Sequence, residues 1–580
     1  MKKRRRRTSL KAPAACLPIF ISAALAWLLS AASAFRLAPS LLRRHTRSGR
    51  PLSASSIAQT TKGIRDGTLT VEEVVRDTLR RVEASDVHGW CSVDGESALS
   101  RARELDKGRA NEGDLPPLYG LPIAVKDTIS VRDMPCTGGS RVLEGYVPSF
   151  DAPCVERLKA AGAVVIGKTN CDEFAMGSTT ETSFFEQTVN PFDLSRTPGG
   201  SSGGSSAVVS NGEVPAALGS DTGGSIRQPA SWCGVVGLKP TYGRVSRRGL
   251  LAYGSSTDCI GPMCTSVEDC AILLEAMAGH DPLDVSSLDA PVPEYAKLVD
   301  QFLNNKESLS GRPLSKMRIG LLKETLDDGE GRMQPAVMAA FKDSLSVFKA
   351  LGAELIEVDI PNLKEYCAAY YITVMSEASS NLAKYDGIRY GLRTSSEDPR
   401  AKRVMVDSRE TGFGQEVKQR ILLGTFALSA GYSDAYYKKA QKMRAALASN
   451  FERVFELVDA LILPTAPTTA YRLGQFKENK VETYIDDLLT VPASLSGLPA
   501  LSVPCGISAE DLPIGLQIVG KPLDELRLLQ IGAGYDEATG WTSRLQKKLQ
   551  AIKGERQAGG GGEEETASVD WTKAFEVIDE

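Results

Sequence analysis

The chain has 580 residues, and its hydrophobic fraction of 42% is enough for a large core in one long domain or in several ordinary ones. Only three residues are histidine, which argues against chemistry that depends on imidazole side chains. The formal net charge of −4 is unevenly distributed, because residues 1–50 hold twelve Lys or Arg and no acid. The remaining residues have 56 basic and 72 acidic side chains, which excludes a domain that binds a nucleic-acid backbone by itself.

Residues 1–34 have the pattern of a secretory signal peptide, because a basic start precedes the apolar residues 14–29 and the small-residue site Ala32-Ser33-Ala34. A transmembrane anchor is the alternative, but Pro18 interrupts the apolar stretch. Residues 35–54 carry Arg, Ser and Thr and no acid, which is typical of a transit peptide. The two segments together are similar to the leaders of proteins of complex plastids. We therefore expect the plastid stroma as the destination, with the mitochondrion as the alternative and no membrane span in the mature chain.

The folded part of the chain is expected to begin near Ser55. Its first clear helix starts where Thr70 and Glu73 form a capping box ahead of an apolar stripe over residues 71–82. The apolar segment 119–127 follows and predicts a buried strand that carries Lys126.

Two later stretches show a helix, a glycine and a strand in close succession, as expected where glycine ends a helix. The first covers residues 152–166 around Gly162, and the second covers residues 336–360 around Gly352. Residues 415–447 are mostly helical, and further apolar runs predict buried strands at 318–322, 460–463, 500–504 and 514–519. Helices that alternate with apolar strands predict an α/β fold in a single large domain over residues 55–547.

Residues 548–580 differ in composition from the predicted domain. This segment becomes rich in Gly and Glu, and residues 559–580 hold seven acids against Lys573. Such a composition predicts a disordered acidic tail. A short docking helix over residues 571–578 is the alternative.

The ten cysteines beyond the leader are scattered singly along the chain. They show neither a CxxC motif nor a Cys/His ligand spacing, so no structural zinc site is expected. Their spread over a large domain favours reduced core thiols over a disulfide scaffold.

Two runs of glycine and serine lie near the middle of the chain. The first is Thr197-Pro198-Gly199-Gly200-Ser201-Ser202-Gly203-Gly204-Ser205-Ser206, and the second is Asp221-Thr222-Gly223-Gly224-Ser225-Ile226-Arg227-Gln228-Pro229. The apolar stretch 207–218 between them argues against a flexible linker. A phosphate-binding loop is also excluded, because no Lys follows either glycine pair.

A serine nucleophile needs an adjacent base, and neither His88 nor His280 lies in a motif that connects it to these serines. Lys126 is the best candidate. An uncharged lysine near pH 7 requires a pKa about 3 units below its usual value, equivalent to about 4 kcal/mol, and burial in an apolar strand supplies such a shift. Strand alternation sends Asp127 to the opposite face, where it does not hold Lys126 protonated.

The glycines of the second run expose successive backbone N–H groups at Thr222, Gly223 and Gly224, as an oxyanion hole requires. The first run supplies another hydroxyl, which we expect between Ser225 and Lys126 as a proton relay. The residues therefore predict a Ser/Ser/Lys amide hydrolase.

Both runs, with the Lys126 strand ahead of them, resemble the amidase signature family in order and in spacing. The resemblance covers about residues 55–547 and implies Ser225 as the acyl-forming nucleophile, Ser201 as the bridging hydroxyl and Lys126 as the base. It further implies a central mixed β-sheet covered by helices on both faces, and a cis peptide between Gly200 and Ser201.

Four blocks of the second half, residues 376–391, 416–425, 431–437 and 486–490, are similar to the glutamine-hydrolysing subunits of tRNA-dependent amidotransferases. This resemblance implies that Arg420 binds the α-carboxylate of glutamine, that Asp487 binds its α-ammonium and that Tyr371 belongs to the same site. A guanidinium and a carboxylate in these positions would select a free amino acid.

The same resemblance implies a heterotrimer with a B and a C subunit, in which ammonia from glutamine converts Glu-tRNA(Gln) to Gln-tRNA(Gln). The B subunit would bind the tRNA and use ATP and Mg²⁺, while this chain would need no metal or cofactor. A stand-alone amidase acting on a small amide and a non-catalytic scaffold are the alternatives.

Overall fold

The computed structural model describes residues 56–109, 115–305, 312–326, 333–361, 363–394, 401–476, 484 and 486–559, which belong to one compact unit. The predicted signal and transit segments and residues 560–580 of the predicted tail lie outside the described residues. Within the described ranges, no helix combines the length and the apolar character that a membrane crossing requires.

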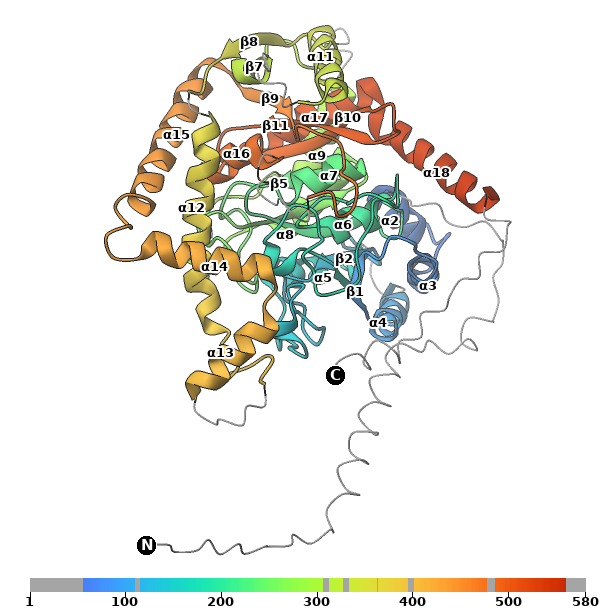
Figure 1. Ribbon diagram of the computed structural model, residues 1–580. Helices are drawn as coiled ribbons and strands as arrows, with labels where there is room; N and C mark the ends of the chain where they lie inside the picture. The colour runs from blue at the N-terminus through green and yellow to red at the C-terminus, as the bar shows by residue number, and fades with distance from the viewer. Residues whose placement is uncertain are drawn as a thin grey trace, which may run out of the picture. The chain divides into compact units, whose positions relative to one another are not determined.

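One sheet of eleven strands forms the centre of the fold (Figure 1). Its order is β1-β3-β2-β4-β6-β5-β10-β11-β9-β7-β8. The strands are β1 (Trp90–Val93), β2 (Pro122–Lys126), β3 (Val164–Thr169), β4 (Ala216–Asp221), β5 (Val236–Lys239), β6 (Cys259–Cys264), β7 (Arg318–Leu322), β8 (Glu354–Val358), β9 (Ala460–Pro464), β10 (Ala500–Ile507) and β11 (Pro513–Val519). Strand β2 runs parallel to β3 and β4, and β7 runs parallel to β8 and β9, whereas the other pairs are antiparallel. The sheet is therefore mixed, as predicted.

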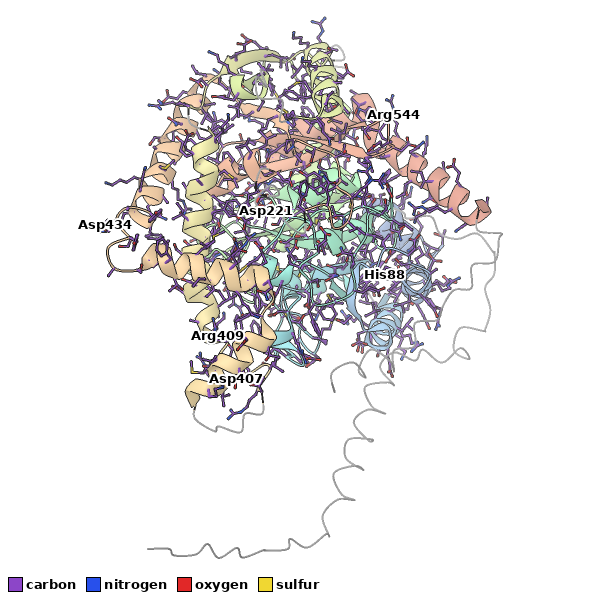
Figure 2. All side chains as sticks on the ribbon, viewed as in Figure 1. His88, Asp221, Asp407, Arg409, Asp434 and Arg544 are labelled. Atoms are coloured by element: carbon purple, nitrogen blue, oxygen red, sulfur yellow. The ribbon has the colours of Figure 1, made fainter. Side chains whose placement is uncertain are left out.

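Helices cover both faces of this sheet. The helices are α2 (Ile57–Arg65), α3 (Val71–Glu83), α4 (Gly95–Gly108), α5 (Pro153–Ala160), α6 (Gly203–Ser210), α7 (Arg227–Cys233), α8 (Val267–Met277), α9 (Tyr295–Asn304), α10 (Lys323–Leu326), α11 (Pro335–Ala350), α12 (Leu363–Asn381), α13 (Ala401–Gly412), α14 (Gln415–Leu428), α15 (Tyr437–Leu457), α16 (Val491–Leu495), α17 (Glu525–Thr539) and α18 (Trp541–Gly559). Charged side chains such as Asp434 and Arg544 lie at the outside of the layers, whereas Asp221 lies in the interior (Figure 2).

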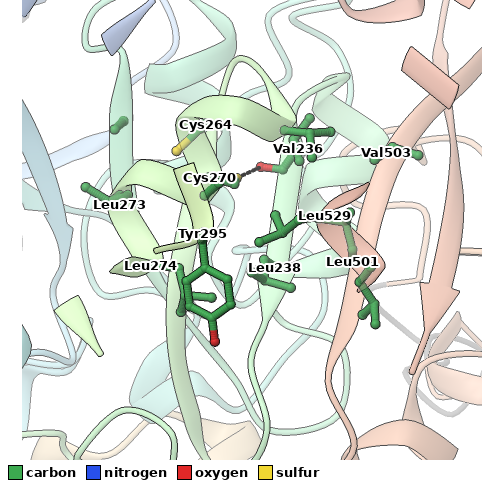
Figure 3. Packing of buried hydrophobic residues seen from close by; sticks show 14 of the residues in the cluster. Val236, Leu238, Cys264, Cys270, Leu273, Leu274, Tyr295, Leu501, Val503 and Leu529 are labelled. Carbon is green, nitrogen blue, oxygen red and sulfur yellow. Dashed lines mark hydrogen bonds between the residues drawn. The ribbon is translucent and has the colours of Figure 1, made fainter. Parts of the chain in front are cut away.

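Alternate residues of the strands enter opposite hydrophobic layers. Ile123 and Val125 of β2 belong to the core under α5, α8, α9, α11 and α17, whereas Ala124 between them belongs to the core under α3, α4 and α6. In the first of these cores, side chains of α8 and α17 meet those of β5 and β10 (Figure 3). The apolar runs of the sequence are continuous because these strands are buried on both faces.

The local signals of the sequence are confirmed where they are strongest. Thr70 and Glu73 form the capping box at the start of α3. Gly162 and Gly352 have φ values of +95° and +92° and end α5 and α11 ahead of β3 and β8. The predicted helical stretch 415–447 divides into α14 and α15, because the turn between them includes Gly431 at a φ of +87°.

Helix α18 extends the folded body past the boundary that the sequence predicts at residue 547. Leu549 is buried with Leu545, Phe192 and Leu512, and Lys553 Nζ donates to Asn211 O at 2.8 Å. The helix is described through Gly559, so the start of the predicted tail is corrected to beyond this residue. The composition misled the prediction, because this helix buries only a narrow stripe and its other side chains are polar.

We expect Leu549→Ala to lower the free energy of unfolding by about 2 to 4 kcal/mol, because it removes buried apolar atoms and leaves a cavity. Chemical denaturation followed by circular dichroism measures the change. Gln550→Ala is the matched control, since Gln550 is the next residue of α18 and is exposed. Equal stability of both variants would contradict the docking of this helix.

Candidate active site

The predicted chemical groups meet where β2 and β4, two parallel neighbours, end. Lys126 is the last residue of β2, the first glycine and serine run leads into α6, and the second run connects β4 to α7. Lys126 and Ser201 are fully buried, and Ser225 is 7% exposed. Carboxyl ends of adjacent parallel strands lie at one edge of a sheet, so the fold brings these distant segments together.

Lys126 Nζ lies 2.8 Å from Ser201 Oγ and 2.9 Å from Ser202 Oγ. Ser202 N donates to Ser225 O at 3.1 Å, which joins the two serine loops through their backbones. The Gly200–Ser201 peptide is cis, as expected. The hydrogen bonds of the described residues include the Lys126–Ser201 half of the predicted relay and none between the hydroxyls of Ser201 and Ser225.

Burial lowers the pKa of Lys126 to about 8, although the neighbouring carboxylates of Asp172 and Asp221 oppose the shift. Asp127 does not contact this amine. Its carboxylate instead accepts from Lys168 Nζ at 3.2 Å and from Thr137 Oγ1 at 2.5 Å. The prediction from strand alternation, that Asp127 turns away from Lys126, is therefore confirmed, and an appreciable fraction of the amine is uncharged near neutral pH.

The second run approaches its neighbours too closely for side chains at its glycines. A Cβ at Gly223 would lie 2.5 Å from Tyr370 Oη, and a Cβ at Gly224 would lie 2.4 Å from Thr490 Oγ1. Within the described part of the chain, the amides of Gly223, Gly224 and Ser225 donate to no protein group. Thr222 Oγ1 donates to Asp258 Oδ1 at 2.7 Å. The loop thus presents free backbone donors next to the Ser225 hydroxyl, as an oxyanion hole requires.

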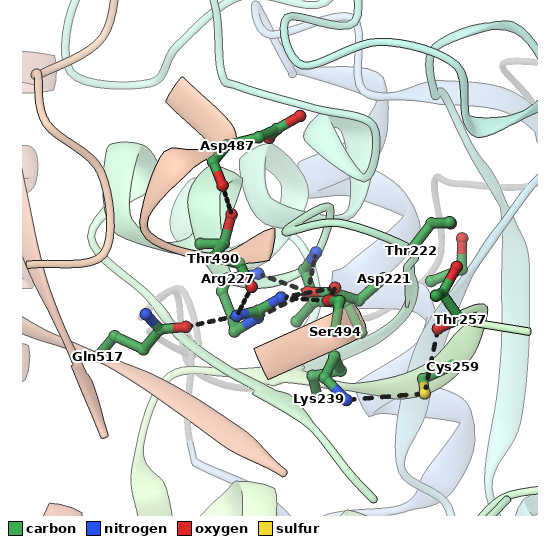
Figure 4. A network of polar contacts seen from close by, with 12 residues as sticks. Asp221, Thr222, Arg227, Lys239, Thr257, Cys259, Asp487, Thr490, Ser494 and Gln517 are labelled. Atoms are coloured by element: carbon green, nitrogen blue, oxygen red, sulfur yellow. Dashed lines mark hydrogen bonds and ion pairs between the residues drawn. The ribbon is translucent and has the colours of Figure 1, made fainter. Parts of the chain in front are cut away.

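A buried ion pair holds this loop at both ends. Asp221 at the end of β4 accepts from Arg227 Nε at 3.0 Å and from its Nη2 at 2.9 Å. Arg227 also donates to Thr490 O at 2.9 Å, to Ser494 Oγ at 2.7 Å and to Gln517 (Figure 4). Burial alone would raise the pKa of Asp221, but Arg227 holds it below its usual range. The pair therefore stays ionised and fixes the loop between β4 and α7.

The three residues predicted to bind an amino acid also come together, and we call them the anchor cluster: Arg420 on α14, Tyr371 on α12 and Asp487 ahead of α16. Tyr371 Oη donates to Asp487 Oδ2 at 2.5 Å, and the Tyr371 ring centre lies 5.6 Å from the Arg420 guanidinium carbon. Arg420 is 4% exposed and pairs with Glu416 at 2.8 Å. Burial raises the pKa of Asp487 to about 6, so this carboxylate is charged at neutral pH.

The anchor cluster adjoins the Ser225 loop. Tyr370, the neighbour of Tyr371 on α12, faces Gly223, and Thr490, which follows Asp487 by one turn, faces Gly224. Thr490 N also donates to Asp487 O at 3.2 Å. The glycine contacts therefore place α12 and the segment from Asp487 to Thr490, which carry Tyr371 and Asp487 of the anchor cluster, against the Ser225 loop.

Comparison with known proteins supports this arrangement. The model of the family described as amidase matches residues 73–529. The chain belongs to the amidase family.

Among relatives of this amidase, the A subunit of the glutamyl-tRNA(Gln) amidotransferase of Synechococcus sp. (strain CC9311) is 48% identical over 491 residues, which cover 84% of this chain and 98% of that protein. The crystal structure of the corresponding protein of the same name from Thermotoga maritima has 37% identity and a TM-score of 0.66, covering 83% of this chain and 94% of that one. The native peptide amidase from Stenotrophomonas maltophilia has 28% identity and a TM-score of 0.69, with 83% and 96% covered. The single-domain α/β fold is thus shared with amidases.

The two histidines that the structure describes lie outside the site. His88 is exposed and faces Glu186 at 3.4 Å, and His280 is exposed as well. In the described ranges, no three His, Cys, Asp or Glu side chains are grouped so that they could hold a metal ion. All ten cysteines described are free thiols, and most of them are buried, as predicted.

Sequence reasoning missed three residues of this site: Ser202, Arg227 and Tyr253. Ser202 and Arg227 stand inside the two runs, but only the folded loops show that one contacts Lys126 and the other pairs with Asp221. Tyr253 Oη accepts from Arg420 Nη1 at 2.7 Å across 167 positions of the chain. No local pattern indicates this bond.

Proposed function

We propose that this amidase is the glutamine-hydrolysing A subunit of a glutamyl-tRNA(Gln) amidotransferase. The observation that carries the proposal is the anchor cluster, in which Arg420 and Asp487 offer opposite charges next to the Ser225 loop. This pair can bind the α-carboxylate and the α-ammonium of a free amino acid, whereas a substrate that is an uncharged amide has no group to pair with either charge. The name of the Synechococcus and Thermotoga relatives supports glutamine as the substrate.

In the proposed reaction, uncharged Lys126 removes a proton from Ser201, which in turn takes the proton of Ser225. Ser225 Oγ then attacks the side-chain amide carbon of glutamine, while backbone N–H groups of the loop from Thr222 to Ser225 hold the oxyanion. The proton returns to the leaving nitrogen as the carbon–nitrogen bond breaks, which releases ammonia and leaves an ester on Ser225. Water, deprotonated through the same relay, cleaves the ester to glutamate and restores the serine.

The word "subunit" in the relatives' name supports work within a complex. We propose that the ammonia passes to a B subunit that binds the tRNA and activates glutamate with ATP and Mg²⁺, and that a small C subunit stabilises the pair. The acidic net charge of the chain beyond its first 50 residues agrees with tRNA contacts on another subunit. The leader supports a plastid location, with the mitochondrion as the alternative.

Co-purification with the B and C subunits of the same organism tests this function. We expect the complex to form Gln-tRNA(Gln) from Glu-tRNA(Gln) in the presence of glutamine and ATP, and we expect the isolated chain to form none. A stand-alone amidase would instead hydrolyse its amide equally well with and without the partners, and no tRNA product would appear.

We expect kcat/KM for glutamine to rise with pH and to reach half of its maximum near pH 8, because only the uncharged form of Lys126 accepts a proton. The sign follows from the group: raising the pH deprotonates the amine and increases the active fraction. Asp487, with a pKa of about 6, adds a further loss at lower pH as it becomes neutral. Initial rates of glutamate release across the range measure the profile, and a flat profile from about pH 6 to about 9 would contradict Lys126 as the base.

A further inference from the structure

The guanidinium of Arg420 is only partly occupied by protein groups. Its Nε donates to Glu416 Oε1 at 2.8 Å, and its Nη1 donates to Tyr253 Oη at 2.7 Å. Neither bond uses Nη2, which carries two further N–H groups. The Tyr484 side chain also interacts with this guanidinium, but the five N–H groups of Arg420 outnumber these protein partners, so donors remain for an acidic ligand.

Tyr253 has a proton without an acceptor. A guanidinium has no acceptor atom, so in the bond with Arg420 the Tyr253 oxygen must accept, and its own O–H remains to donate. Among the described residues, no protein atom accepts that proton, although Tyr253 is only 2% exposed. Burial raises the pKa of this phenol, so the proton stays in place at neutral pH. Buried hydroxyl groups normally find an acceptor, and a missing one points to a ligand.

The position of Tyr253 is set from the Ser225 loop. Its backbone N donates to Asp258 Oδ2 at 3.0 Å, and the other oxygen of the same carboxylate accepts from Thr222 Oγ1 at 2.7 Å. Its backbone O accepts from Asn381 Nδ2 at 3.1 Å. Asp258 thus ties Tyr253 to the loop that holds the nucleophile, and Tyr253 in turn touches Arg420.

We propose that Tyr253 is a substrate-binding residue that donates a hydrogen bond to the α-carboxylate of glutamine, alongside Arg420. This inference rests on the proposed function. Two adjacent donors, the Tyr253 O–H and the Arg420 Nη2 group, match the two oxygens of a carboxylate, whereas an α-amide would present an N–H group to one of them. Tyr253 thereby adds discrimination between a free amino acid and a residue whose carboxyl group is blocked.

The test compares Tyr253→Phe with the parent in the complete amidotransferase, with glutamine and glutamine α-amide as substrates. We expect KM for glutamine to rise about 10-fold with kcat nearly unchanged, since one charge-assisted hydrogen bond is lost in ground and transition states alike. KM for the α-amide should stay the same. Tyr366→Phe is the matched control, because Tyr366 is a buried phenol of the same core that contacts Asn450 instead.

The same substitution in an Arg420→Ala variant distinguishes a direct contact between Tyr253 and the substrate from an effect that Tyr253 exerts through Arg420. If Tyr253 touches the substrate, Tyr253→Phe should raise KM for glutamine further when added to Arg420→Ala. No further rise would overturn the inference, because it would show that the phenol only orients the guanidinium. An unchanged KM in Tyr253→Phe of an active complex would also overturn it while leaving the proposed function intact. A parent complex without glutaminase activity would overturn both.

Discussion

Ser225→Ala is expected to reduce glutamine-dependent amidation by about 10⁴-fold or more, because it removes the only protein atom proposed to bond to the substrate carbon. Amidation driven by added ammonium should remain close to that of the parent complex, since the ester on Ser225 serves only to release ammonia. Both rates are measured on the same purified complex as formation of Gln-tRNA(Gln).

The position of Ser225 makes this comparison sharp. The loop is held by the buried Asp221–Arg227 pair and by the backbone bond from Ser202, neither of which uses the Ser225 side chain. The substitution therefore removes one hydroxyl and leaves the loop anchored. Loss of both activities in a folded complex would contradict the division of labour between this chain and its partners, and retention of both would exclude Ser225 as the nucleophile.

Lys126→Met is expected to lower kcat for glutamine hydrolysis by about 10³-fold or more, because no other described base lies within hydrogen-bond distance of Ser201 Oγ. The fold should persist. Lys126 is fully buried, and no carboxylate accepts a hydrogen bond from its amine. An apolar side chain of similar length therefore removes a desolvated amine and leaves no opposite charge buried without a partner. Steady-state kinetics and thermal unfolding of the same preparation measure the two effects.

Lys168 on the adjacent strand β3 is the matched control. It is equally buried but pairs with Asp127 at 3.2 Å. Lys168→Met leaves that carboxylate buried without its charge partner, so it should cost about 3 to 5 kcal/mol of stability and leave kcat of the folded protein near that of the parent. Lys126→Met should therefore lower kcat with little loss of stability, whereas Lys168→Met should lower stability with little loss of kcat. A Lys126→Met variant with full activity would contradict the assignment of Lys126 as the base.

The sequence predicted the site as far as local patterns reach. Lys126 could be selected because it interrupts an apolar strand, and the serines because glycine surrounds them between apolar segments. The assignment of Arg420, Asp487 and Tyr371 depended on similarity to a family, because single charged residues on a helix or in a turn carry no chemical signal of their own. The structure brings these three together through Tyr371, whose hydroxyl reaches Asp487 and whose ring lies beside Arg420.

The boundaries of the fold show the same division. Strands β2, β3, β7, β9, β10 and β11 were predicted within a few residues, because most of their residues are buried and apolar. The more exposed β8 was predicted from the glycine that precedes it, whereas β1, β4, β5 and β6 were not predicted. The predicted end of the domain at residue 547 falls inside helix α18, since most of the surface of this helix is polar and its attachment depends on Leu545 and Leu549 meeting Phe192 and Leu512. Such a helix is stabilised by its docking site and not by its composition.

By itself, the sequence determined that this protein is an α/β amidase with a buried lysine and two serines in glycine-rich loops. Strand burial, helix capping and loop chemistry depend on residues that are close in the sequence. Only the tertiary structure decided which residues from distant parts of the chain contact the lysine, the serines and the substrate-binding residues. Arg227 meets Gln517 across 290 positions, Thr222 reaches Asp258, and Tyr253 reaches Arg420 on α14. These contacts depend on the order of the strands in the sheet and on the helices packed against it, and neither is encoded in any single stretch of the chain.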